Sequence, residues 1–591
     1  MRHWQRGNRN AATPSTRIVI QTRGRTSTTG RVRCATVTMT YENATAAVMA
    51  APQFELAETS IHGVLTTVYK NAPANLAQVF MATRAHGDAT SLVYEGERYS
   101  FSDVMGSADA LGAALVTRYG VAKGDRVAIA MRNYPEWVIS FIAVTSIGGI
   151  CVSLNSWWTA DELAYAISDS TPRVLIGDEQ RLALAADACK TQQTSMLGVR
   201  LNKPVVGVDR WEDVLVPGAT PPSVEIGPDD DATILYTSGT TGSPKGAVST
   251  HRAVISALMS FACRQTIEGI RAGIDPTAPT DPPSFILIVP LFHVTGCVAV
   301  MMSCLVGGAK LVIMYKWDVD KALEIIEREQ ITNFVGVPTQ AWDLVHAPRF
   351  ADYDTSSLRS IGGGGAPAPP AQVALVAKSF PKGSPGIGYG MTETNAYGPQ
   401  NTGDDYLTHP SSAGRFVPAV QVEVRDADGR PVGRGQRGEI FFKGPNLIRG
   451  YWGKPKATAE TIIDGWLASG DIGIIDDDGF VYVVDRAKDM ILRGGENIYC
   501  AEVEAAIYEH PSIHEAAVYG IPHERLGEEV GATIVLQPGT VLSADDLRAY
   551  LQQKLASFKV PAHVRVSAAP LPRNAAGKFL KRELRDRAIS G

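Results

Sequence analysis

A run rich in glycine and hydroxyl side chains, residues 236–246, is the strongest chemical signal in this 591-residue chain. It reads YTSGTTGSPKG and follows the apolar residues 232–235, which predict a buried strand. Backbone amides, hydroxyls and an ammonium group on a loop after a strand can surround a polyphosphate. It is not a Walker loop, because in that motif Gly precedes the lysine and Ser or Thr follows it, whereas here the order is Pro-Lys-Gly. The alternative interpretation is a flexible Gly/Ser/Thr linker. The candidate phosphate-binding residues are Thr237, Ser238, Gly239, Thr240, Thr241, Gly242 and Lys245.

Six further segments place charged, hydroxyl or imidazole side chains beside glycines or at the end of apolar runs. In chain order they are PLFHVTG (290–296), GGGGAP (362–367), GYGMTET (388–394), SGD (469–471), DRAKDMI (485–491) and PRNAAGK (572–578). Each is a weak signal alone, but their fixed order is specific.

Together these seven segments resemble the ordered motifs of the adenylate-forming superfamily: acyl-CoA synthetases, luciferases and peptide-synthetase adenylation domains. The resemblance covers roughly residues 75–585 and is greatest to fatty-acid-type acyl-CoA ligases. It implies ATP-dependent activation of a carboxylic acid to acyl-AMP with release of pyrophosphate, followed by transfer to coenzyme A. ATP, Mg²⁺ and coenzyme A are therefore the expected cofactors and co-substrates.

The resemblance also implies a role for each motif. Gly364, Ala366 and Pro367 belong to an adenine-binding turn, and Gly388, Tyr389, Gly390 and Thr392 to a second nucleotide-contacting segment. Asp471 and Arg486 would hold the ribose, Lys488 would be the hinge, and Gly494 and Gly495 would meet coenzyme A. Glu393 would bind magnesium, and Lys578 would be the adenylation lysine.

Charge is the physical reason for the lysines and the metal. Adenylation brings a carboxylate against the α-phosphorus of ATP, so two anions must approach and the growing charge must be stabilised. Lys245 would offset the β- and γ-phosphates, Glu393 would hold Mg²⁺, and Lys578 would approach the reacting carboxylate. The competing interpretations are an ordinary surface carboxylate for Glu393 and a solvated lysine for Lys578, with Lys581 close enough in sequence to be mistaken for it.

His293 is the one histidine in a stretch that has no Asp, Glu, Lys or Arg between Asp281 and Lys310. A lone histidine there is often a hydrogen-bonded core residue. The resemblance favours a residue that lines the acyl pocket and belongs to the catalytic site. It need not act as a general base, since a carboxylate nucleophile is already ionised at pH 7.

The acid is not specified by these motifs. A medium- or long-chain fatty acid is our first expectation, ahead of branched, aromatic and steroid side-chain acids, and the four glycines 362–365 would leave room for a large acyl group. Two other functions stay open: an acyl-AMP ligase that hands its product to a carrier protein, and an inactive paralogue that serves as a binding protein. The second predicts loss of the charged motif residues, and none is lost.

Alternating strand and helix patterns must position these motifs. The pattern of strand 126–131, helix 135–147 and strand 150–153 predicts a βαβ unit, and it recurs at 173–177, 285–314 and 320–337. Short alternating segments at 420–425, 439–443 and 480–484 indicate a small antiparallel unit. We therefore expect an α/β fold: a large N-terminal domain of parallel subdomains with a small β unit, and a small, mobile α+β C-terminal domain.

The expected boundaries are a basic leader at 1–41, a large AMP- and acyl-binding domain at 42–484, a hinge at 485–495 and a small domain at 496–591. In the small domain the pattern predicts helices 501–509 and 544–555 and strands 514–519, 529–536 and 564–567. The leader is interpreted as a disordered tail, a targeting segment, or an upstream extension of a natural start at Met39.

Composition limits the partners. The net charge is −5 although the first 40 residues carry eight arginines and no acidic residue, so the remaining chain is acidic and a nucleic-acid partner is not expected. Seven scattered cysteines without a CxxC pair favour reduced thiols in a cytoplasmic protein. The apolar stretch 281–310 is broken by proline and glycines, so no integral membrane segment is expected. Peripheral membrane association and a homodimer are left open.

Overall fold

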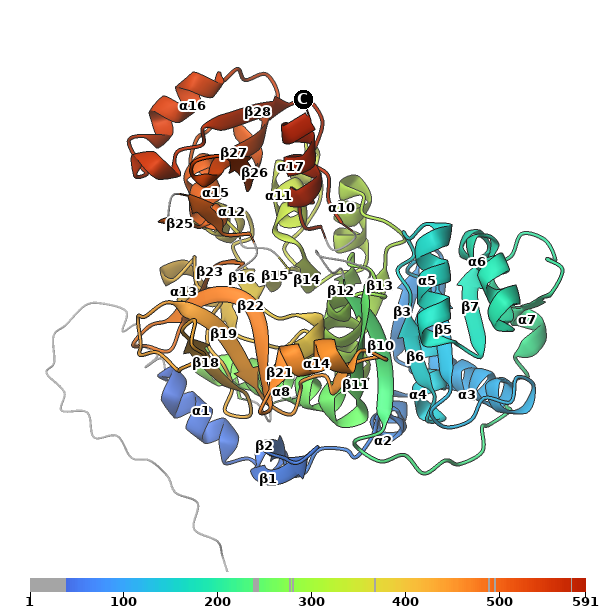
Figure 1. The fold of residues 1–591 in the computed structure, drawn as a ribbon. Helices are drawn as coiled ribbons and strands as arrows, with labels where there is room; N and C mark the ends of the chain where they lie inside the picture. The colour runs from blue at the N-terminus through green and yellow to red at the C-terminus, as the bar shows by residue number, and fades with distance from the viewer. Residues whose placement is uncertain are drawn as a thin grey trace, which may run out of the picture.

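Parallel β-sheets flanked by helices form the framework of the protein in a computed structural model, and they confirm the predicted α/β class. The structure describes residues 39–590 except 238–243, 276–277, 279–280, 366–367, 487–488, 494–495 and 575–576. Within these residues there are two eight-stranded sheets, two five-stranded sheets and one hairpin. Figure 1 shows the last five-stranded sheet, with its helices, as a body at one end of the molecule.

The first large sheet has the strand order β20-β11-β10-β6-β5-β7-β8-β9. Its inner strands are parallel and rich in buried Val, Ile and Ala, as expected for strands covered on both faces. Its strands are β5 (Arg126–Ala130), β6 (Ile150–Ser153), β7 (Val174–Asp178), β8 (Ser195–Val199), β9 (Val208–Arg210), β10 (Asp231–Thr237), β11 (Lys245–Thr250) and β20 (Gly450–Tyr451). The last two pair antiparallel at one edge, where the predicted phosphate loop joins β10 to β11.

The second large sheet has the order β17-β16-β15-β14-β12-β13-β3-β4 and is parallel except at its two edges. Its strands are β3 (Thr90–Tyr94), β4 (Glu97–Ser100), β12 (Ser284–Leu287), β13 (Lys310–Ile313), β14 (Asn333–Gly336), β15 (Ser360–Gly364), β16 (Ser384–Gly388) and β17 (Gln400–Thr402). Gly364 and Gly388 are register partners at the ends of β15 and β16. Two of the predicted nucleotide-binding segments therefore leave the sheet side by side.

The helices that cover these sheets begin at recognisable signals. Proline stands at the first helical position of α4, α11, α12 and α14, and Ser100 and Thr159 begin capping boxes. The helices are α2 (Leu76–Thr83), α3 (Phe101–Thr117), α4 (Pro135–Ser146), α5 (Ala160–Ser170), α6 (Glu179–Gln192), α7 (Trp211–Val214), α8 (His251–Arg271), α9 (Ser303–Gly307), α10 (Val319–Arg328), α11 (Pro338–His346), α12 (Pro370–Ser379), α13 (Gly403–Thr408) and α14 (Pro455–Thr461). Between β12 and β13 a π-helix over Thr295–Met302 continues into α9.

An antiparallel unit follows, as the short alternating segments predicted. It consists of β18 (Gln421–Arg425), β19 (Gly438–Lys443), β21 (Ile462–Ile463), β22 (Trp466–Ile475) and β23 (Val481–Arg486). Asp471 on β22 and Arg486 at the end of β23 are register partners, so the two predicted ribose-binding residues face each other across the ladder.

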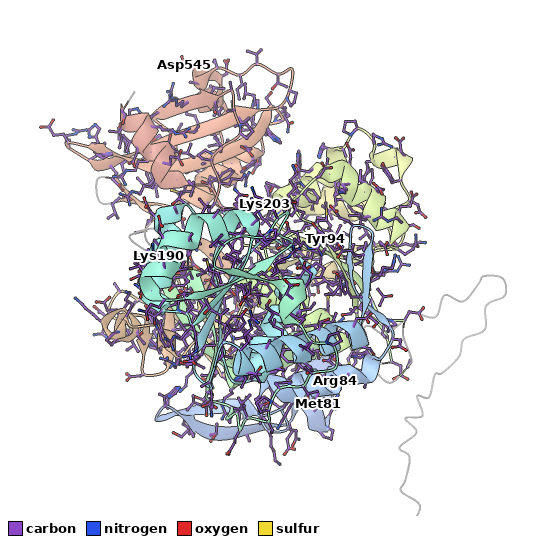
Figure 2. The ribbon with its side chains drawn as sticks, turned by 90° about the vertical axis from the view of Figure 1, so that its right-hand side faces the viewer. Met81, Arg84, Tyr94, Lys190, Lys203 and Asp545 are labelled. Atoms are coloured by element: carbon purple, nitrogen blue, oxygen red, sulfur yellow. The ribbon has the colours of Figure 1, made fainter. Side chains whose placement is uncertain are left out.

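The C-terminal body combines β24 (Ile491–Arg493), β25 (Glu496–Ile498), β26 (Ile513–His523), β27 (Gly527–Leu536) and β28 (His563–Ser567) with α15 (Cys500–Tyr508), α16 (Ala544–Leu551) and α17 (Lys581–Ser590). In Figure 2 the label of Asp545 marks this body at the top of the view, and Lys190 on helix α6 is drawn lower. The sequence predicted one helix over 544–555, whereas α16 ends at Leu551 and a short 3₁₀ turn follows at Ser557–Lys559. The domain boundaries themselves stay predictions.

The first described residues pack against helix α8. Tyr41, the last residue of the predicted leader, is buried and begins helix α1 (Tyr41–Met49), ahead of the hairpin β1 (Leu56–Ile61) and β2 (Val64–Tyr69). Tyr41 Oη donates to the Phe416 carbonyl at 2.6 Å, and the Arg415 guanidinium lies 4.0 Å from its ring centroid. Residues 1–38 lie outside the described residues.

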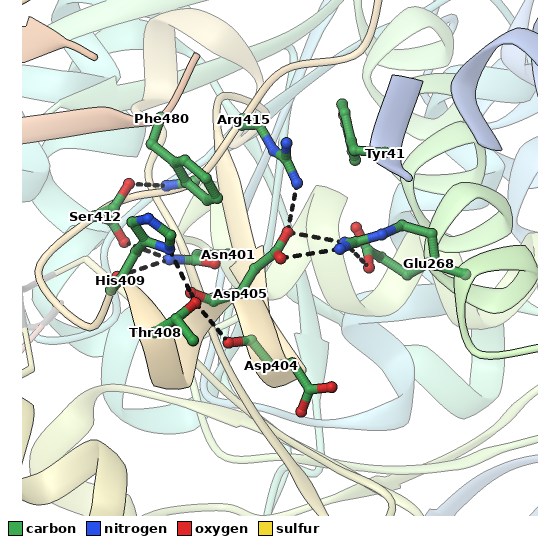
Figure 3. Close-up of polar contacts among 12 residues, drawn as sticks. Tyr41, Glu268, Asn401, Asp404, Asp405, Thr408, His409, Ser412, Arg415 and Phe480 are labelled. Carbon is green, nitrogen blue, oxygen red and sulfur yellow. Dashed lines mark hydrogen bonds and ion pairs between the residues drawn. The ribbon is translucent and has the colours of Figure 1, made fainter. Parts of the chain in front are cut away.

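Asp405 on α13 connects these contacts of Tyr41 and Arg415 to the second large sheet. Its carboxylate accepts from Arg271 at 2.8 and 2.9 Å and from Arg415 at 2.6 Å (Figure 3). Because α13 directly follows β17, whose Gln400 pairs with Gly388, the network supports the strand pair that carries the second nucleotide-binding segment. No helix of the described residues is long and apolar enough to cross a membrane.

Candidate active site

Lys578 belongs to the C-terminal body, but its side chain lies at the predicted nucleotide site of the large domain. It follows β28 on a turn in which its N–H donates to Asn574 Oδ1 at 3.0 Å, and a Cβ on neighbouring Gly577 would lie 3.2 Å from Val337. Burial and the nearby Arg486 guanidinium lower the pKa of the Lys578 ammonium to about 8, while Asp471 and Glu393 oppose that shift. The turn therefore brings one lysine to residues from three separate predicted motifs.

Lys581, the alternative candidate, has another partner. Its ammonium forms a 2.8 Å ion pair with Glu504 of α15, within the C-terminal body. Although burial opposes its charge, Glu504 and other neighbouring acidic groups raise the pKa of Lys581. Of the two lysines, Lys578 is the one that faces the predicted nucleotide site.

Asp471 is a buried residue at the centre of a cluster of polar side chains near Lys578. It accepts a 2.5 Å hydrogen bond from Tyr389 Oη and lies 3.3 Å from Arg486 Nε, while its own N–H donates to Ser469 Oγ at 3.0 Å. The serine that precedes Gly470 thus holds the turn by its hydroxyl. The contacts with Tyr389 and Arg486 orient the Asp471 carboxylate, which a ribose-binding role requires.

Glu393 lies at the other side of the site, in the short 3₁₀ turn Thr392–Thr394. Its side chain is only 7% exposed, and Tyr451 Oη donates to its Oε1 at 2.7 Å. No lysine or arginine forms an ion pair with it among the described residues. A buried carboxylate without a basic partner among the described residues can bind a cation that arrives with the substrate.

The described residues hold no cluster of three or more His, Cys, Asp or Glu side chains that would form a complete metal cage. One carboxylate is nevertheless the usual protein contribution to a magnesium site whose other ligands are substrate phosphates and water. Glu393 therefore fits Mg²⁺ delivered with ATP better than a resident structural metal.

Lys245 begins β11, directly after the phosphate loop. Its ammonium lies 4.9 Å from the ring centroid of Tyr451, the same residue that bonds Glu393. Thr237 ends β10 and pairs with Lys245, so the two strands hold both ends of the loop. The loop residues Ser238, Gly239, Thr240, Thr241 and Gly242 lie outside the described residues, as do Ala366, Pro367, Lys488, Gly494 and Gly495.

His293 lies between β12 and the π-helix. Its Nδ1 accepts from the Thr295 N–H at 3.3 Å, and burial together with the Lys578 charge lowers the pKa of its imidazole to about 4. The imidazole is therefore a weak base that stays neutral at working pH, which agrees with a wall residue rather than a general base. Gly296 is required here, since a Cβ would lie 2.2 Å from the Pro290 carbonyl oxygen.

The glycines at the end of β15 serve another purpose. Gly362 and Gly363 have ordinary strand geometry, and a Cβ on either would meet no atom closer than 3.6 Å. Neither backbone conformation nor packing demands glycine at these two positions, in contrast to Gly390, where a Cβ would lie 2.3 Å from the Ala396 carbonyl oxygen. Missing side chains at 362 and 363 thus leave space beside the nucleotide segments.

Tyr451 is the residue that sequence reasoning missed. It lies on β20, some sixty residues from Glu393 and two hundred from Lys245, in a stretch without a recognisable motif. Only the pairing of β20 with β11 brings it to the site.

The fold and this arrangement define a nucleotide-dependent carboxylate-activating enzyme. Residues 79–452 match the AMP-binding enzyme family, and residues 502–578 match the AMP-binding enzyme C-terminal domain. The chain belongs to this family, within the adenylate-forming superfamily, and is an AMP-forming acid–thiol ligase.

Three similar proteins illustrate the range of acids. The chain is 36% identical over 472 residues to a feruloyl-CoA synthase of Amycolatopsis sp, covering 79% of this chain and 90% of that protein. It is 36% identical over 476 residues to the long-chain-fatty-acid–CoA ligase FadD13 of Mycobacterium tuberculosis, covering 80% and 90%. The structure of o-succinylbenzoate CoA synthetase from Bacillus subtilis with its acyl-adenylate intermediate matches with a TM-score of 0.73 and 28% identity, covering 87% and 99%.

Proposed function

We propose that this enzyme activates an apolar carboxylic acid, in the first place a fatty acid, and transfers it through acyl-AMP to coenzyme A. The main support for this proposal is the position of Lys578. Its charge acts on four residues of the predicted site: Glu393, Asp471, Arg486 and His293. That convergence is what adenylation needs, because the carboxylate and the α-phosphate must meet beside a positive charge.

Each side chain has one task in this proposal. Asp471 and Arg486 hold the ribose, Lys245 offsets the β- and γ-phosphates, and Lys578 stabilises charge where the carboxylate oxygen bonds the α-phosphorus and pyrophosphate leaves. Glu393 would hold Mg²⁺, which would supply positive charge beside the phosphates. The thiol of coenzyme A then attacks the acyl carbonyl, and AMP leaves.

The acid is proposed from the apolar surroundings of His293. Val294, Cys297 and Val298, close to it in sequence, are buried, and the side-chain-free positions Gly362 and Gly363 leave space beside the nucleotide segments. An acyl site lined by these residues would favour an acid without further charge. Six buried free thiols among the described cysteines agree with the cytoplasmic location proposed from the sequence.

A panel of acids tests the substrate. A medium-chain and a long-chain fatty acid, a cinnamic-type acid and a steroid side-chain acid are each supplied with ATP, Mg²⁺ and coenzyme A, and pyrophosphate and thioester are measured. The proposal expects the highest kcat/KM for a fatty acid. A preference for either ring-containing acid over both fatty acids would replace the acid while keeping the reaction.

Glu393→Gln is expected to raise the Mg²⁺ concentration for half-maximal pyrophosphate release by about tenfold, because a neutral amide oxygen is a poorer ligand for a hard cation. The measurement is a Mg²⁺ titration at saturating acid. The matched control is Glu460→Gln, which neutralises a largely exposed glutamate on α14. An unchanged Mg²⁺ requirement in Glu393→Gln would remove Glu393 from the metal site.

The rate of adenylation is expected to fall as the pH rises through about 8. The pKa of Lys578 is lowered by burial and by Arg486, so the ammonium loses its proton about two pH units earlier than an ordinary lysine. His293, with a pKa of about 4, should add no inflection between pH 5 and 7. The measurement is kcat/KM against pH, which reports the free enzyme. A flat profile to about pH 9.5 would contradict the lowered pKa of Lys578 or the need for its charge, and Lys578→Ala separates the two.

A further inference from the structure

Tyr451 contacts both groups that would manage the phosphate charge, although no motif contains it. Its hydroxyl donates to Glu393 Oε1 at 2.7 Å, and its ring lies under the Lys245 ammonium at 4.9 Å from the centroid. The residue is 7% exposed, like Glu393 itself, so the hydrogen bond between them is shielded from water.

The connection at 446–451 also fixes the backbone around Glu393. The Ile448 N–H donates to the Glu393 carbonyl at 3.0 Å, and Asn446 Nδ2 donates to the Thr394 carbonyl at 2.9 Å. Asn395 returns a bond to the Asn446 carbonyl at 2.9 Å. The Glu393 turn is therefore held to residues 446–448 by one backbone and two side-chain hydrogen bonds, while its carboxylate is oriented by Tyr451.

Tyr451 is equally well fixed to the phosphate loop. It pairs with Ala247 in the β11–β20 ladder, and the next residue, Trp452, donates its N–H to the Gly246 carbonyl at 2.8 Å. The Tyr451 N–H donates to Thr458 Oγ1 at 2.9 Å. One rigid side chain thus spans from the strand that begins with Lys245 to the turn that contains Glu393.

We propose that Tyr451 is a positioning residue that sets Glu393 and Lys245 at a fixed separation for one metal–polyphosphate group. It touches neither acid nor nucleotide in this account. Its hydroxyl fixes the rotamer of the carboxylate, and its ring supports the lysine through a cation–π contact. This inference rests on the proposed role of Glu393 as the magnesium ligand.

Two substitutions separate the two contacts. Tyr451→Phe keeps the ring and removes the hydroxyl, so it should weaken metal binding roughly 3- to 10-fold, the net effect of losing one typical hydrogen bond. KM for ATP at saturating Mg²⁺ should change little. Tyr451→Leu removes the ring as well and should raise that KM in addition, because the Lys245 ammonium loses its support.

The direct readout is binding rather than turnover. Mn²⁺ is titrated into the full-length enzyme with an ATP analogue that carries a methylene bridge between the α- and β-phosphates, and bound metal is measured by electron paramagnetic resonance. The same titration is made with Glu393→Gln and with the double variant. Tyr451→Phe should have no further effect on Mn²⁺ affinity in the Glu393→Gln background, since its only route to the metal is that carboxylate.

Tyr406→Phe is the matched control. Tyr406 is also buried, but its hydroxyl has no hydrogen-bond partner among the described residues, so this variant should bind Mn²⁺ as the wild type does. If Glu393→Gln weakens Mn²⁺ binding and Tyr451→Phe does not, the positioning role is wrong. If neither variant changes Mn²⁺ binding, the proposed metal role of Glu393 is wrong as well. Additive effects in the double variant would also contradict the inference.

Discussion

Lys578→Ala should lower the rate of acyl-adenylate formation by about 10²- to 10³-fold, the cost of removing a preorganised charge from a transition state. The Lys578 ammonium acts on the residues that surround the predicted ribose and metal positions, and burial strengthens its electrostatic effect. Acid-dependent exchange of labelled pyrophosphate into ATP measures this half-reaction alone.

The second half-reaction should survive the same substitution. The charge is needed while carboxylate meets ATP, and not when the thiol attacks a finished adenylate. Purified acyl-AMP and coenzyme A should therefore give thioester at close to the wild-type rate. The control is Lys554→Ala, which removes a lysine of the same domain whose partner is Glu509. Undiminished exchange in Lys578→Ala would transfer the role to another group, and loss of both half-reactions in a folded variant would contradict the separation of the two steps.

Asp471→Asn should lower kcat/KM for ATP by about 10²-fold, mainly through a higher KM. Asp471 is 5% exposed, and it accepts from Tyr389 while facing Arg486, so its remaining lone pairs are oriented for ribose hydroxyls. An amide removes the charge that Arg486 faces and places a donor where two donors already point.

Initial rates against ATP concentration and the ATP-induced shift of the melting temperature both measure the loss. Asp464→Asn, in the exposed turn before β22, neutralises a carboxylate of the same antiparallel unit and should behave as the wild type. Equal KM for ATP in Asp471→Asn and the wild type would mean that the ribose is held elsewhere.

Local patterns predicted the elements well where periodicity was strong. The expected strand at 126–131 and helix at 501–509 correspond to β5 and α15, because strong periodicity leaves few alternatives. The expected helix 544–555 was too long, since α16 ends at Leu551 and the 3₁₀ turn at Ser557–Lys559 follows. Helix ends depend on capping and packing that periodicity does not record.

The site was predictable only where one short segment carried several chemical groups. The motifs of Lys245, Glu393, Asp471 and Lys578 could be found in this way, and the choice of Lys578 over Lys581 needed the ion pair of Lys581 with Glu504. Tyr451 could not be found, because its role depends on a ladder between strands two hundred residues apart. Tyr41 was assigned to the leader for the same reason: its partner Arg415 is distant in sequence.

The most direct test of the central claim follows one oxygen atom. An acid from the panel that releases pyrophosphate is labelled with ¹⁸O in its carboxyl group and converted with ATP, Mg²⁺ and coenzyme A. If the carboxylate attacks the α-phosphorus, one labelled oxygen stays on phosphorus when the thiol displaces AMP, so mass spectrometry should find AMP with one ¹⁸O in equal amount to the thioester. Unlabelled AMP, or label in inorganic phosphate together with ADP, would contradict an acyl-adenylate intermediate.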